Sequence, residues 1–279
     1  MMMRSSYLML LFIFLLTGCR LEQKFAKSFI SAGRPSEYLL LPPTVILKYN
    51  LKEFEVPGID TLDGYRKDST LLANSLFLKS INDSLFIAQF TYGFVKNLES
   101  YGARVMLENS IDTLMEKEAD AWVVNIAQFT LEEYIHPYSS EEEVYDEVLV
   151  IDGIDLNAIN YNLWMELSHM NSEKKNKILF ASDFLLDNIN GTLKQNLLSG
   201  RYKFDYTIDT ITSTQVYDFA DRFGREIASY LFDYLMNEYI GEKLPENYPY
   251  ERYYYHYDMR GKSFYPVGEE DRFIELEGY

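Results

Sequence analysis

Two amphipathic helices, far apart in the chain, limit the folds that this sequence can adopt. The first, predicted over residues 82–101, has apolar side chains every three or four residues: Ile87, Phe90, Phe94, Leu98 and Tyr101. The second, predicted over residues 213–240, has the same spacing in Val216, Phe219, Phe223, Ile227, Tyr230, Leu231 and Tyr234. A stripe of this kind needs an apolar surface to pack against, so both helices are expected to cover a shared core.

The ends of both helices carry recognisable signals. Asn82 or Asp83 can cap the first helix, and Gly102 suits the position just after its end. Thr212, with Gln215 three residues later, predicts a capping box at the start of the second helix.

The segments between and before the helices are expected to form strands. Extended segments are predicted at residues 38–41, 45–49, 103–107, 119–131, 148–151, 159–167 and 178–181. Asp152-Gly153 predicts a tight hairpin turn, and the acidic run at residues 141–143 predicts an exposed loop. Residues 50–80 look irregular, with a short helix at 71–78, and residues 182–211 have no clear assignment.

This order of elements predicts an α+β fold, in which a mixed, largely antiparallel sheet is covered by the two main helices. Residues 37–240 are expected to form a single α/β domain. A polar tether at residues 19–36 would precede this domain, and a tyrosine-rich extension at residues 241–279 would follow it.

The first nineteen residues have the features of an export signal. Arg4 precedes an unbroken apolar run at residues 7–16, and Leu16-Thr17-Gly18-Cys19 follows directly. Ten helical residues rise only about 15 Å, which is too short for a hydrocarbon core about 30 Å thick. The sequence therefore predicts a signal peptide at residues 1–18 and not a membrane span.

Leu16-Thr17-Gly18-Cys19 resembles the lipobox of bacterial lipoproteins. The resemblance implies cleavage before Cys19 and covalent diacylglycerol and acyl chains on that residue, with no other cofactor. An ordinary secretory peptide with an incidental cysteine is the alternative, but Cys19 is the only cysteine in the chain. Two or three acyl chains would make the anchoring lasting. Sorting habits of such lipoproteins, with Arg20 after the cysteine, favour the outer membrane and a periplasm-facing domain.

Charge excludes one large class of partners. The chain has 26 basic and 43 acidic residues, and removing the signal peptide with Arg4 takes the net charge from −17 to −18. Nucleic-acid binding depends on basic side chains that neutralise phosphates, so no nucleic-acid partner is expected. Such a surface is compatible with a cationic partner or with simple solubility.

The order of elements over residues 38–240 also resembles a group of envelope proteins. These include the amino-terminal domain of the Tol-system translocation protein and the lipoprotein activators of penicillin-binding proteins. The likeness is one of pattern, with Ala119-Asp120-Ala121 and residues 172–177 at corresponding places, and the insertion at 50–80 departs from it. Members of the group bind partners in the envelope, which implies an accessory role for this chain.

Motifs for catalysis or metal binding are weak. Glu133 with His136 and Glu166 with His169 have the spacing of di-iron ligands on helices, but here they fall on strand-like segments, so a metal site is not expected. Gly261-Lys262-Ser263 lacks the earlier glycine and the following helix of a phosphate-binding loop. No enzymatic activity is expected.

A cluster of tyrosines near the C-terminus is the remaining feature. Alternation along a strand would place Tyr253, Tyr255 and Tyr257 on one face and Tyr254 on the other. Exposed rings could contact a protein or a sugar, whereas a tail that folds back would bury them. The sequence thus predicts a lipid-anchored, non-catalytic accessory or assembly factor that binds an envelope protein, in one version associated with a transporter. The alternative is a glycan-binding module or carbohydrate-active enzyme that uses these tyrosines and surface carboxylates.

Overall fold

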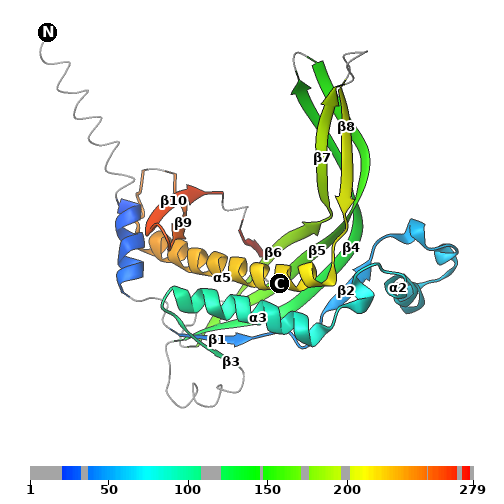
Figure 1. Cartoon of the computed structure of the whole chain (residues 1–279). Coiled ribbons are helices and arrows are strands. Elements are labelled where there is room, and N and C mark those ends of the chain that lie inside the picture. Colours follow the sequence, from blue (N-terminus) through cyan, green and yellow to red (C-terminus); the bar gives the residue numbers. More distant parts are fainter. Residues whose placement is uncertain are drawn as a thin grey trace, which may run out of the picture.

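The computed structural model describes residues 21–32, 37–107, 121–144, 147–170, 176–195, 202–249, 251–268 and 272–276. Two long helices lie across one face of a twisted sheet, and a β-rich arm projects from one end of this body (Figure 1). The predicted α+β class, with a mixed sheet and two main helices, is confirmed.

The main helices have the following bounds: α2 (Gly64–Ala73), α3 (Asp83–Ser100) and α5 (Ser213–Lys243), with a further helix at residues 21–31. Single 3-10 turns occur at η1 (Glu53–Glu55), η2 (Ile59–Thr61) and η3 (Leu78–Ser80). The strands are β1 (Glu37–Leu41), β2 (Leu47–Asn50), β3 (Arg104–Leu107), β4 (Trp122–Val144), β5 (Glu147–His169), β6 (Lys177–Leu186), β7 (Asn188–Gln195), β8 (Tyr202–Asp209), β9 (Tyr254–Asp258), β10 (Ser263–Val267) and β11 (Ile274–Leu276).

The main sheet has seven strands in the order β11-β6-β5-β4-β1-β3, and β2 also pairs with β4. The pairs β4–β5, β5–β6 and β6–β11 are antiparallel, whereas β1 and β2 run parallel to β4 and β3 runs parallel to β1. β1 and β2 pair with successive parts of β4, and Pro42-Pro43 lies between them. One extended segment, interrupted at the two prolines, therefore runs parallel to β4.

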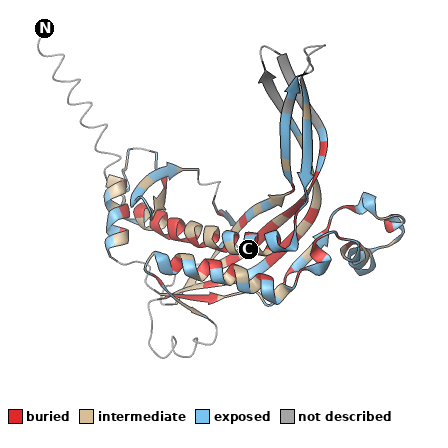
Figure 2. Cartoon of the chain, in the orientation of Figure 1, coloured by how far each residue is buried: buried red, intermediate tan, exposed pale blue. Residues whose placement is uncertain are grey.

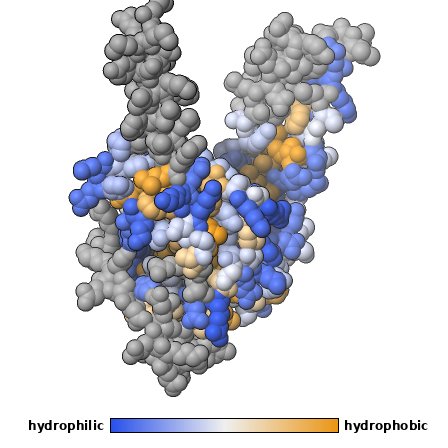
Figure 3. All heavy atoms as spheres, turned by 90° about the vertical axis from the view of Figure 1, so that its left-hand side faces the viewer, coloured by the Kyte–Doolittle hydropathy of each residue, from blue (hydrophilic) through white to orange (hydrophobic). Residues whose placement is uncertain are grey.

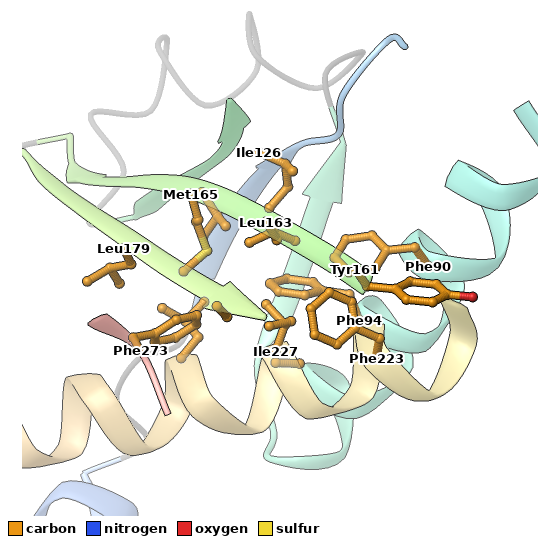
Figure 4. Close-up of a cluster of buried hydrophobic side chains, with 14 of the residues drawn as sticks. Phe90, Phe94, Ile126, Tyr161, Leu163, Met165, Leu179, Phe223, Ile227 and Phe273 are labelled. Atoms are coloured by element: carbon orange, nitrogen blue, oxygen red, sulfur yellow. The ribbon is translucent and has the colours of Figure 1, made fainter. Parts of the chain in front are cut away.

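The core lies between the sheet and the two long helices (Figures 2 and 4). Phe86 and Phe90 of α3 pack edge-to-face on Phe129 of β4, with ring centroids 5.1 and 5.2 Å apart. Tyr161 of β5 packs on Phe219 of α5 at 4.2 Å. The two predicted stripes therefore face the same surface, and aromatic rings of both helices pack on rings of the strands.

The predicted helix ends are confirmed. The Asn82 side chain accepts a hydrogen bond from the backbone N–H of Leu85, and Gly102 has a φ of 87°, which favours glycine. Thr212 and Gln215 form the complete capping box.

Two glycines set the distance between the long helices. A Cβ atom on Gly93 of α3 would come closer than 3.0 Å to the carbonyl oxygen of Asp221, and one on Gly224 of α5 would come equally close to the carbonyl oxygen of Phe90. The helix backbones are therefore in direct contact at these two positions, which fixes both helices in a single layer.

The arm consists of the distal parts of β4 and β5 and of the β7–β8 hairpin (Figure 1). Ile154 and Leu156 of β5 pack with Tyr138, Ile189 and Phe204 in a small apolar cluster. The β7–β8 hairpin is mostly exposed (Figure 2), and hydrophobic atoms are visible on one flank of the arm (Figure 3).

The strand ends differ from the sequence prediction in this region. Asp152-Gly153 is not a hairpin turn but part of β5, and the predicted loop at residues 141–143 is part of β4. Val144 pairs with Glu147, so the hairpin connection lies there. Gly153 has a φ of 75° and lies beside the register shift between Tyr138 and Ser140. A glycine suits this irregular position in β5, because it can adopt a positive φ.

The segments on either side of the predicted domain also belong to the body. Residues 21–31 form a helix whose Ala26 and Phe29 are buried, and the Phe29 ring lies 5.5 Å from that of Phe232. Over its described residues 21–32, the segment predicted as a polar tether is therefore largely a helix that packs on the body. At the other end, β11 joins the main sheet and Phe273 enters the core (Figure 4), so the chain has no separate tyrosine-rich extension over the described residues.

The helix contact gives a sharp stability test. In Gly224→Ala the new Cβ meets backbone atoms that cannot move aside, and we expect the free energy of unfolding to fall by about 2 kcal/mol or more. Gly241→Ala, in the same helix, is the control, because its Cβ meets only the flexible end of Arg252. Urea unfolding followed by circular dichroism measures both variants. Equal stability of the two would contradict the close contact.

Candidate binding face

The sheet has one face covered by helices and one that carries none of the described helices. Residues such as Leu131, Leu163 and Leu179 point toward α3 and α5 and are buried. Because side chains alternate along a strand, their neighbours point to the opposite side. We call this opposite surface the open face, and its side chains are Leu47, Tyr49, Asn125, Gln128, Thr130, Glu132, Asn160, Asn162, Trp164, Glu166, Ile178, Phe180, Ser182, Phe184, Ile274 and Leu276.

Apolar side chains lie along both margins of the open face. Leu47 and Tyr49 of β2 are exposed at one margin. At the other margin, Phe184 of β6 is 49% exposed and Ile274 of β11 is 52% exposed. The Trp164 ring lies next to that of Phe180, with centroids 4.9 Å apart, and extends this apolar margin toward the centre of the sheet.

Hydrogen-bonded polar side chains occupy the centre of the open face. Ser182 Oγ donates to Asn162 Oδ1 at 2.7 Å, and Asn162 Nδ2 donates to Glu132 Oε2 at 3.0 Å. Gln128 Nε2 donates to Thr130 Oγ1 at 3.1 Å. The first two bonds join neighbouring strands and the third lies within β4; together they restrain the side chains of a face that has no covering layer of described helices.

The charged side chains of the open face, Glu132 and Glu166, are both acidic. Glu166 accepts hydrogen bonds from Asn176 at 2.7 Å and Asn125 at 3.5 Å. Exposed rings, amides and carboxylates on a sheet can anchor a protein surface through apolar contacts, with hydrogen bonds around them. The same groups can also bind sugars.

Glu133 of the first Glu-x-x-His pair is buried, and its carboxylate is surrounded by hydrogen-bond and ion-pair partners from the chain itself. Its carboxylate accepts hydrogen bonds from the backbone N–H groups of Leu76, Phe77 and Leu78, at 2.7, 2.9 and 3.3 Å. Lys52 Nζ, itself buried, lies 2.8 Å from Glu133 Oε1. This cluster attaches the segment 50–81 to β4, because Lys52 belongs to the segment and Glu133 belongs to the strand.

The histidines of the two pairs are not brought together with the glutamates. The His136 ring stacks on Phe184 at 6.3 Å, and the His169 ring meets Trp122 edge-to-face at 4.8 Å. Both pairs lie on strands, as predicted. In the part of the chain that the structure describes, no group of three or more His, Cys, Asp or Glu side chains could hold a metal ion.

Most of the C-terminal tyrosine cluster lies in the interior. Tyr254 and Tyr255 are buried, and the Tyr257 ring packs 5.0 Å from Phe264 and 6.0 Å from Phe232. Only Tyr253 of the four predicted contact residues is substantially exposed, at 52%. The second sequence interpretation, a tail that folds back and buries its rings, is therefore correct for Tyr254 and Tyr255, and these two cannot present rings to a partner.

Buried polar groups of α5 attach this tail. Asp233 accepts hydrogen bonds from the backbone N–H of Tyr257 at 3.0 Å and faces His256 Nδ1 at 2.6 Å. Burial raises the pKa of the Asp233 carboxyl, and the hydrogen bond with His256 acts in the opposite direction. The Asn237 side chain bonds both the N–H and the carbonyl of Tyr255. Gly261 and Lys262 lie in the turn between β9 and β10, and Ser263 begins β10, so a strand and not a helix follows this motif.

Cys19 and the rest of the signal motif, Leu16-Thr17-Gly18, lie outside the described residues. Over the described residues, none of the helices has the length and apolar character needed to span a membrane.

The comparisons with known proteins give little. No protein-family model and no curated protein matches the chain. Among solved structures, one match is the crystal structure of a Helicobacter pylori protein that is provisionally designated a neuraminyllactose-binding hemagglutinin homolog. It is 12% identical, with a TM-score of 0.29, and the match covers 75% of this chain and 92% of that one. A TM-score of this size does not establish a shared fold.

The ion pair between Lys52 and Glu133 predicts a large effect for a small change. Glu133→Gln removes the charge but keeps the shape. The buried Lys52 ammonium then has only the partly exposed Glu55, 3.2 Å away, as an acidic partner, so we expect a loss of about 3 kcal/mol in unfolding free energy. Glu166→Gln is the matched control on the next strand, because the Glu166 carboxylate accepts its hydrogen bonds from the side-chain amides of Asn125 and Asn176. Thermal and urea unfolding measure the difference. Similar losses in both variants would contradict the role of Glu133.

Proposed function

We propose that this chain is a lipid-anchored, non-catalytic protein of the bacterial envelope that binds a protein partner through the open face. The observation that carries the proposal is the uncovered sheet surface, with apolar side chains at its margins and bonded polar groups at its centre. Interfaces of this composition have anchor residues surrounded by hydrogen-bonding groups. An accessory role in the envelope, in one version beside a transporter, fits the same surface.

The proposed anchor would hold this surface near a membrane. Cys19 lies two residues before the helix 21–31, which is packed on α5. With acyl chains on Cys19, the body would have little freedom to move away from the bilayer, because its first helix is already part of the fold. The proposed location is the periplasmic side of the outer membrane.

A second candidate function, glycan binding, has one observation in its favour. The neighbouring rings of Trp164 and Phe180 lie beside the amide and carboxylate groups of Gln128 and Glu166 on the open face. Aromatic faces can stack on sugars while such groups bond the hydroxyls. The open face thus replaces the C-terminal tyrosines as the place where either ligand would bind.

Cross-linking in intact cells tests the proposal. A photoreactive residue at Phe184 should capture one envelope protein in stoichiometric amount, whereas the same residue at Tyr65 of α2, which is 85% exposed, should not. With that protein purified, Phe184→Ser combined with Ile274→Ser should weaken binding at least tenfold. The control pair is Phe54→Ser with Tyr65→Ser, which removes two rings that are 76% and 85% exposed elsewhere.

Each outcome separates the candidates. In Cys19→Ala the unanchored chain should leave the membrane fraction and lose the cross-link. Equal binding by the two double variants, or no captured protein, would contradict the proposed function. Binding on a glycan array that is lost in the Phe184 and Ile274 variant, without any protein partner, would support the second candidate.

A further inference from the structure

Strand β6 has ten residues, but only part of its outer edge pairs with another strand. On its inner side it pairs with β5 from Lys177 to Leu186. On its outer side β11 pairs only with Ile178, Leu179 and Phe180. Among the described residues, no strand pairs with residues 181–186 on that side, and we call this stretch the free edge of β6.

The free edge has the features of a strand that can accept another strand. Residues 181–186 contain no proline and one charged side chain, that of Asp183. Proteins commonly protect exposed edges with lysine, proline or bulges, and β6 has none of these here. The Phe184 N–H donates to Oδ1 of the preceding Asp183 at 2.8 Å, a local bond that a new strand could replace.

The two sides of the free edge differ in character. Ser182 and Phe184 point to the open face, where Phe184 and Ile274 form an exposed apolar margin. Asp183 points toward α5, where Arg222 Nη2 lies 3.9 Å from its carboxylate and Glu226 is close by. An added strand would therefore have the apolar Phe184 and Ile274 on one of its sides and the charged group around Asp183 on the other.

We propose that an extended segment of the protein partner, with alternating apolar and polar residues, adds to the free edge of β6 as an antiparallel strand. This inference rests on the proposed function and specifies how the partner is held. β11 provides the precedent, because it pairs with the same edge in the antiparallel direction and stops after three residues. Main-chain bonds supply affinity in this binding mode, and the alternating side chains supply specificity.

A proline substitution tests the edge separately from the face. Along an antiparallel strand, N–H groups alternate in direction, so the Ser182 N–H has the same direction as that of Phe184. Ser182→Pro removes this donor, whereas Ser182→Ala removes only the hydroxyl that bonds Asn162. With the purified cross-linked envelope protein as the probe, we expect Ser182→Pro to bind at least tenfold more weakly than Ser182→Ala, which lacks the same hydroxyl and therefore serves as the reference.

Hydrogen exchange provides a second measurement that does not depend on the stability of the proline variant. The amides of residues 181–186 in the full chain should exchange at least tenfold more slowly once the envelope protein is bound. Binding without this protection, or equal binding by the two Ser182 variants, would overturn the inference and leave the proposed function intact. Protection that appears in the purified chain alone at high concentration would also overturn it, since a second copy would then occupy the edge. Failure to capture any envelope protein would overturn both.

Discussion

The direct contact between the backbones of α3 and α5 determines the arrangement of the rest of the molecule. Gly93 and Gly224 allow it, because a Cβ at either position would collide with a carbonyl oxygen of the other helix. The two helices therefore form one compact layer on one side of the sheet, and their aromatic stripes pack on the same strands. With the helices confined to that side, the opposite side of the sheet carries no described helix.

Two polar arrangements make this one-sided fold possible. On the helix side, the carboxylate of Glu133 satisfies three backbone N–H groups and Lys52, so a segment of about thirty residues is attached without an apolar core of its own. On the open face, Asn162 and Ser182 bond across the strands and give these polar groups partners where no described helix covers the sheet. The apolar groups are then left to the margins, where a partner can reach them.

The sequence predicts local features well and features that depend on distant contacts poorly. Helix periodicity and the caps at Asn82 and Thr212 are encoded within a few residues, and all of them are confirmed. Asp152-Gly153 was wrongly predicted to be a hairpin turn. The positive φ of Gly153 occurs beside a register shift within the β4–β5 pair, and the hairpin connection lies earlier in the chain, between Val144 and Glu147. The tyrosine tail is buried because Asp233 and Asn237 of α5 bond its backbone, which no local pattern reveals. The extended segments predicted at residues 159–167 and 178–181 lie in β5 and β6, but only the structure places Trp164 and Phe180 side by side.

Hydroxyl-radical footprinting tests the central claim, that the open face is the working surface, most directly. Labelling is compared between the purified chain and the chain in intact envelopes. The account predicts that Trp164 and Tyr49 are oxidised in the purified chain and protected in the envelope, whereas the exposed Tyr65 is oxidised in both and the buried Tyr255 in neither. Protection of Tyr65 without protection of Trp164 and Tyr49, or identical labelling in both samples, would contradict it.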